Sequence, residues 1–184
     1  MVFPPYPAHG EFDIYATMDT AKEVGGDFYD FYFVGENKLG FLIADVSGKG
    51  IPAAMFMMTA KTLIKGYAES GKSVDEVFTI ANAKLCESNE AGMFVAAWMG
   101  ILDITTGLLE FANAGHNPPL VRHADGRFEF LKSKSGFILI SSEREANSSF
   151  VLTSTTVSRL PLVIFARDLF IFTILSTMSF FMRK

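Results

Sequence analysis

A hairpin signal around residues 28–45 constrains the fold of this 184-residue chain more than any other feature. Two apolar, β-rich runs, Phe28–Val34 and Lys38–Asp45, flank the short turn sequence GEN. Aromatic and β-branched residues favour strands, and a short glycine-containing connection favours an antiparallel pair. If the hairpin is centred on Glu36, residue i faces residue 72 − i, so Asp27 faces Asp45. A loop one residue longer or shorter would shift this pairing.

Strands and helices are predicted in separate groups along the rest of the chain. A first strand is expected at Phe12–Met18. Two helices follow the hairpin, one with Pro52 in its first turn and one after a capping-box pattern, Ser73 to Glu76. Strands return in MFVAAWMGILD, LLEFANAG and PLVRHADGRFEFL, the last a hairpin with a two-residue loop at Asp125-Gly126. This grouping indicates an α+β fold with antiparallel sheets.

Composition places the chain among globular proteins and narrows its function. Hydrophobic residues make up 49% and charged residues 20%, which suits a packed core. A net charge of −4 with no long basic run argues against nucleic acid as a partner. Cys86 is the single cysteine, so no internal disulfide is expected and a reducing compartment fits. No signal peptide is visible at the start of the sequence, and a cytoplasmic location is predicted. Trp98 and the methionines Met55, Met57 and Met58 are expected in the core.

Two carboxylates side by side repel each other at neutral pH unless a proton, a basic residue or a cation lies between them. Lys22 and Lys49 are the basic residues nearest in sequence to Asp27 and Asp45. An oxygen-only donor set without nearby histidine or cysteine suits Mg²⁺ or Mn²⁺ rather than zinc. The neighbouring glycines leave room for backbone or a phosphate to approach. The alternative is that both aspartates are ordinary turn residues at the ends of a hairpin. The SGKG sequence that follows lacks the spacing of a nucleotide-binding P-loop.

Three motifs in order carry a resemblance to a known family: EVGGDFYDF, IADVSGKGIPAAMFM and NAGHNPPLV. Together with the intervening FVAAWMGILDITTGLLEFANAGHNPP, they resemble the bacterial PPM-type phosphatases of the SpoIIE-like, or RsbU-like, branch. The match runs roughly from Phe12 to Phe137. The resemblance implies a PPM-type β-sandwich flanked by helices in αββα layers. It also implies metal-dependent hydrolysis of phosphoserine or phosphothreonine in a regulatory protein, with Mn²⁺ or Mg²⁺ as cofactor.

The resemblance assigns roles to individual residues. Asp27 and Asp45 match metal-site aspartates, catalytic through metal-bound water, and the backbone carbonyl of Val46 matches the adjacent metal ligand. In many members the substrate is an anti-sigma-factor antagonist in a partner-switching circuit. A phosphorylated protein is therefore the expected partner, and a homodimer is left open. His116 in AGHN is expected to order the turn before the two prolines, and Lys49 is either an exposed loop lysine or a phosphate contact.

The C-terminal quarter departs from the family pattern. The family continues to a DG[VI]TEA-type motif and a later aspartate that help to hold metal, and this sequence has neither. Asp168 is the first candidate for a substitute ligand, whereas Asp103 and Asp125 lie in turn contexts. The chain is therefore divided into residues 1–140, an incomplete phosphatase domain, and residues 141–184, a divergent apolar tail. The alternative to an enzyme is a catalytically impaired binding module of the same fold.

Three interpretations of residues 141–184 are open. The tail is buried as strands that complete the sandwich, it contacts a membrane surface or a partner, or it is not native to this domain. The uncharged run Leu169–Met182 is shorter than the roughly 18–20 apolar residues that a membrane-spanning helix needs.

Overall fold

The computed structural model describes residues 25–87, 89–123, 125–132 and 138–139, together with Ile14, Ala16 and the backbone of 155–157, 163–166 and 170–171. The elements follow the predicted grouping of strands, helices and strands. In chain order they are β1 (Phe28–Phe33), β2 (Lys38–Val46), α1 (Gly50–Glu69), α2 (Val74–Cys86), β3 (Val95–Asp103), β4 (Leu108–Ala114), β5 (Leu120–Arg122), β6 (Phe128–Phe130), β7 (Thr155–Val157), β8 (Val163–Ala166) and β9 (Phe170–Ile171).

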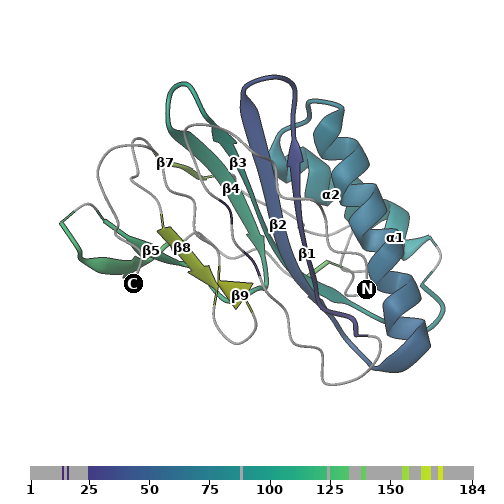
Figure 1. Ribbon diagram of the computed structural model, residues 1–184. Helices are drawn as coiled ribbons and strands as arrows, with labels where there is room; N and C mark the ends of the chain where they lie inside the picture. Colours follow the sequence, from purple (N-terminus) through teal and green to yellow (C-terminus); the bar gives the residue numbers. More distant parts are fainter. Residues whose placement is uncertain are drawn as a thin grey trace.

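The strands form two sheets, and every named strand pair is antiparallel. The larger sheet has the order β1-β2-β3-β4-β7 and the smaller one β6-β5-β8-β9. Figure 1 shows the two helices on one side of the larger sheet and the smaller sheet on the other side. The α+β fold with antiparallel sheets and flanking helices is confirmed. Among the described residues both helices cover the larger sheet, so the observed layers are helix, sheet and sheet.

The β1–β2 hairpin has the predicted register. Phe28 pairs with Ala44 and Phe33 pairs with Leu39, so paired residue numbers add up to 72. The turn is closed by a hydrogen bond of 2.8 Å from the Val34 N–H to the Lys38 carbonyl. The two aspartates that flank the hairpin therefore lie beside each other, one position beyond its last pair.

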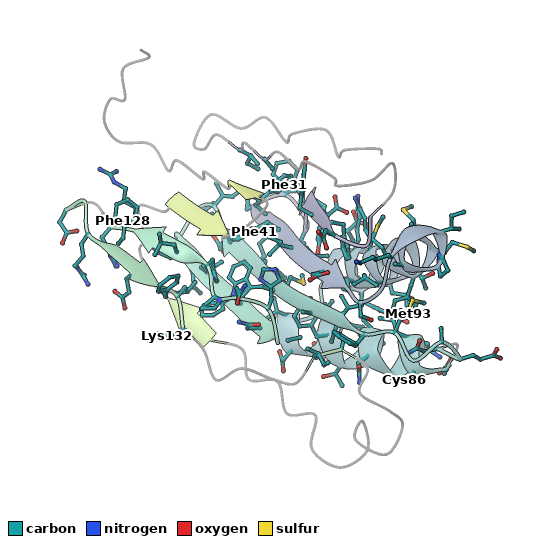
Figure 2. The ribbon with its side chains drawn as sticks, turned by 90° about the horizontal axis from the view of Figure 1, so that it is seen from below. Phe31, Phe41, Cys86, Met93, Phe128 and Lys132 are labelled. Carbon is teal, nitrogen blue, oxygen red and sulfur yellow. The ribbon has the colours of Figure 1, made fainter. Side chains whose placement is uncertain are left out.

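Alternation along the strands gives the larger sheet two buried faces. The face toward the helices carries Phe28, Tyr32, Leu42 and Ala44. Helix α1 buries its apolar positions at helical spacing against this face: Ala53, Phe56, Met57, Ala60, Ile64 and Ala68. The opposite face carries a second, aromatic cluster that includes Tyr29, Phe31, Phe41, Trp98 and Phe111 and continues to Val121 of the smaller sheet. Figure 2 shows Cys86 and Met93 at the helical side and Phe128 at the far end of the molecule.

Both helices start where the sequence predicts. Pro52 lies in the first turn of α1, where a missing backbone N–H costs little. Ser73 is the N-cap of α2, and its backbone N–H and hydroxyl both donate to Oε2 of Glu76 at 3.0 Å. The expectation that all three methionines are core was wrong for two of them. Met57 is buried, but Met55 and Met58 are 68% and 56% exposed, because they fall on the outer face of α1.

The β5–β6 hairpin forms as predicted, but its loop is one residue longer than expected. Leu120 pairs with Phe130 and Arg122 with Phe128, and the His123 N–H donates to the Arg127 carbonyl at 2.8 Å. The contact between His123 and Arg127 therefore closes the loop, in which Gly126 has a φ of 86°. An Asp-Gly pair suits both a two-residue loop and a three-residue loop with glycine in the left-handed conformation, so sequence did not decide between them.

Residues from the C-terminal segment contribute strands to both sheets. β7 pairs with β4 at one edge of the larger sheet, and β8 pairs with β5 in the smaller one. The proposed division of the chain at residue 140 stays a prediction, and most of the strand expected at Phe12–Met18 lies outside the described residues. Within the part of the chain that the structure describes, no helix is both long enough and apolar enough to cross a membrane.

Candidate functional site

The two predicted site aspartates meet at one end of the larger sheet. Asp45 lies near the end of β2, opposite Ala96 of β3, and is exposed. Asp27 immediately precedes β1 and is partly buried. The two carboxyl groups lie close enough together that Asp45 affects the ionisation of Asp27. Two carboxyls this close repel each other when both are ionised.

The proximity of Asp27 and Asp45 changes the pKa of Asp27. Burial, together with the neighbouring side chain and negative charge of Asp45, raises the pKa of Asp27 to about 7, from an ordinary value of 3.8. Like charges at this range cannot both ionise freely, so a proton remains on the pair up to neutral pH. A divalent cation is the alternative way to neutralise two such carboxylates.

Gly26 brings the backbone of the preceding segment against β2. A Cβ at this position would lie 2.8 Å from the carbonyl oxygen of Val46 and 3.0 Å from the Val46 Cβ, closer than side chains tolerate. Only glycine therefore allows this approach. The Val46 carbonyl, the third predicted ligand, consequently lies next to the residue that precedes Asp27.

The loop from β2 to α1 depends on glycine in another way. Gly48 and Gly50 have φ angles of 97° and 72°, which other residues rarely adopt. Ser47 anchors the loop to the segment before β3, because its N–H donates to the Phe94 carbonyl at 2.9 Å and its hydroxyl accepts from the Phe94 N–H at 2.8 Å. Lys49 between the two glycines is exposed. The loop therefore turns tightly from Asp45 into helix α1.

His116 orders its turn, as predicted, and lies close enough to the site to sense the charge of Asp45. Burial lowers the pKa of His116, while the Asn117 carbonyl and the negative charge of Asp45 oppose this shift. Its Nδ1 lies 2.9 Å from the Asn117 carbonyl, so the neutral ring with a proton on Nδ1 donates there. This contact with the Asn117 carbonyl orients the imidazole near Asp45.

Asn113 is the residue of this region that sequence analysis missed. It is only 3% exposed and bonds the His116 backbone twice: Nδ2 donates to the carbonyl at 2.9 Å, and Oδ1 accepts from the N–H at 2.8 Å. A side-chain amide can brace a turn in this way. The available signal was an asparagine in the apolar run LLEFANAG, three positions before the histidine.

The donor set of the site consists of oxygen atoms. Among the described residues, no group of three or more histidine, cysteine, aspartate or glutamate side chains is arranged to hold a metal ion. Two carboxylates and the Val46 carbonyl remain, and Asp168 lies outside the described residues. Carboxylate and carbonyl oxygens fit a hard cation such as Mg²⁺ or Mn²⁺, which would replace the proton of Asp27.

Comparison with known proteins places the chain in a family. Residues 35–157, more than half of the chain, match the model of the stage II sporulation protein E (SpoIIE) family. The chain belongs to the SpoIIE family. It is 30% identical over 138 residues to the phosphoserine phosphatase RsbU of Bacillus subtilis, a match that covers 74% of this chain and 41% of RsbU.

Solved structures agree with this assignment at the level of the fold. The RsbU and RsbW domains of Rv1364c from Mycobacterium tuberculosis superimpose with a TM-score of 0.71 at 24% identity, over 89% of this chain and 44% of that one. RsbX in complex with magnesium gives a TM-score of 0.66 at 13% identity, over 87% of this chain and 76% of that one. The chain spans 27–41% of the length of the curated relatives that it matches.

Proposed function

We propose that this SpoIIE-family domain hydrolyses phosphoserine or phosphothreonine in a protein, with a divalent cation at Asp27 and Asp45. One observation carries the proposal: the hairpin register brings two carboxyls side by side at its end, and the pKa of Asp27 is raised to about 7. Such a pair is built to bind a positive charge. The relationship to a phosphoserine phosphatase supplies the reaction class.

Each residue of the site has a defined part in this proposal. The carboxylates of Asp27 and Asp45 and the carbonyl of Val46 would hold Mn²⁺ or Mg²⁺. When bound, the cation supplies an activated water and neutralises phosphoryl oxygens. Gly26 permits the close approach of backbone on which the site depends. Asn113 and His116 fix the turn beside Asp45.

The substrate is proposed to be a phosphorylated regulatory protein of the anti-sigma-factor antagonist type. This follows from membership of the SpoIIE family, whose RsbU-like branch the three motifs resemble. The net charge of −4 gives no reason to expect a nucleic acid instead.

The test is phosphate release from a phosphoserine peptide, measured with Mn²⁺, with Mg²⁺ and with EDTA. Turnover is expected only with a divalent cation and is expected to be lost in Asp45→Ala. Asp103→Ala is the matched control, because Asp103 is a partly exposed aspartate at the end of β3 whose carboxylate accepts hydrogen bonds from Thr105 and Thr106. Unchanged Mn²⁺ affinity in Asp45→Ala would overturn the site assignment.

A second candidate is a binding module of the same fold without turnover. It is favoured by the absence of a third carboxylate around the pair within the described residues. In that case isothermal titration calorimetry detects Mn²⁺ binding that Asp45→Ala abolishes, while no phosphate is released from the peptide.

A further inference from the structure

Lys61 of α1 contacts the edge of strand β1 close to the site. Its ammonium donates a long hydrogen bond of 3.4 Å to the Tyr29 carbonyl and lies 3.7 Å from Oδ2 of Asp30. β1 is an edge strand of the larger sheet, and edge strands leave part of their backbone without a strand partner. A lysine from the covering helix therefore fastens the start of β1, two residues after Asp27.

Asp30 gives this contact its strength. It is 1% exposed, and its Oδ1 accepts a hydrogen bond of 2.9 Å from the neighbouring Phe31 N–H. Oδ2 is buried without a hydrogen-bond donor among the described residues. A buried carboxylate in this state depends on a nearby positive charge, and Lys61 is the nearest one. Lys65, one turn further along α1, adds a weaker contribution.

We propose that Lys61, together with Asp30, is a positioning residue that sets the spacing between Asp27 and Asp45. Asp45 lies one residue before the end of β2, and the short loop 47–49 joins β2 to the start of α1. Asp27 is joined to the middle of the same helix through the contact of Lys61 with Tyr29 and Asp30. Helix α1 thus holds both carboxylates, one through the chain and one through Lys61. The inference rests on the proposed function, because it assumes that the pair binds a cation.

The experiment measures Mn²⁺ affinity by calorimetry and thermal unfolding on the full chain for Asp30→Asn, Lys61→Met and the double variant. Lys61→Met and the double variant are expected to bind Mn²⁺ about tenfold more weakly, the lower end of the range for residues that support metal ligands. The double variant leaves no unpaired buried charge and is therefore expected to recover stability relative to Lys61→Met. It does not recover the contact with Tyr29.

This contrast separates positioning from a general structural role. A double variant that regains both stability and wild-type Mn²⁺ affinity overturns the inference. Lys84→Met is the control, because Lys84 pairs with Glu87 at 2.8 Å on α2 and should leave Mn²⁺ affinity unchanged. If the double variant does not fold, Asp30→Asn decides: roughly threefold weaker Mn²⁺ binding supports the inference, and wild-type affinity overturns it. Wild-type protein that binds no Mn²⁺ overturns the proposed function itself, and this inference with it.

Discussion

Asp27, just before β1, and Asp30, within β1, lie on opposite faces of the larger sheet. The surroundings of these two aspartates are opposite in charge. Asp27 meets another carboxylate, Asp45, at the open end of the aromatic face. Asp30, on the helical face, meets the ammonium of Lys61. Burial is the largest cause of a raised pKa in both. The charge of Asp30 is thus balanced by Lys61, whereas no described residue forms an ion pair with Asp27 or Asp45, which is why this pair suits an added cation.

The largest expected effect is a loss of Mn²⁺ affinity, which should be much greater when Asp45 is replaced than when Asp30 is replaced. Asp45→Asn should weaken Mn²⁺ binding by at least about 100-fold, because a direct ligand is lost. Asp30→Asn should weaken it by about tenfold at most, because it acts through position alone. Calorimetric titration of both variants tests this. Equal losses in the two variants would contradict the distinction between the faces.

The second effect is a loss of stability, and it is expected for the contact between Lys61 and Asp30 on the face of the sheet that packs against the helices. Lys61→Met leaves the buried Asp30 carboxylate uncompensated and should lower the free energy of unfolding by about 3 kcal/mol, near the low end for a broken buried pair because Lys61 is 20% exposed. Urea unfolding with and without Mn²⁺ measures it. Lys65→Met serves as the comparison, since Lys65 is 39% exposed and pairs with Glu69 at 3.8 Å. An equal loss of unfolding free energy in Lys65→Met would refute the special role of Lys61.

Two glycine substitutions sharpen the comparison. Gly26→Ala meets the Val46 carbonyl at 2.8 Å, and Gly100→Ala meets Trp98 and Phe41 at 2.8 and 2.9 Å in the aromatic core. Each should cost about 2 kcal/mol of stability by overpacking. Only Gly26→Ala should also weaken Mn²⁺ binding, because it moves the backbone beside Asp27. A loss of affinity in both variants would show that affinity simply follows stability.

The smallest effect is a pH dependence of the metal-free protein. The folded pKa of Asp27, about 7, lies above the ordinary 3.8, so between these values the folded state binds more protons than the unfolded state. The contribution of Asp27 to the free energy of unfolding therefore falls as the pH rises from about 4 to about 7. In EDTA, the wild type should lose a few degrees of melting temperature relative to Asp27→Asn from pH 4 to pH 8. Parallel profiles would contradict the raised pKa.

Sequence alone determined the hairpin, its register and hence the meeting of Asp27 with Asp45. These are local matters, because the short turn GEN sets the pairing of the two strands that it joins. The helix starts at Pro52 and Ser73 were predicted for the same reason, since capping depends on a few adjacent residues.

The tertiary structure decided what surrounds the pair. Lys61 and Tyr29 are 32 residues apart in sequence, and no pattern along the chain shows that they touch. The sequence analysis did not single out Asp30, the second aspartate of GGDFYDF, although it stands in the middle of an apolar strand. Likewise, the proximity of His116 to Asp45 depends on how β4 lies against β3 and β3 against β2. Contacts between distant elements follow from packing of whole layers, and local preferences do not encode them.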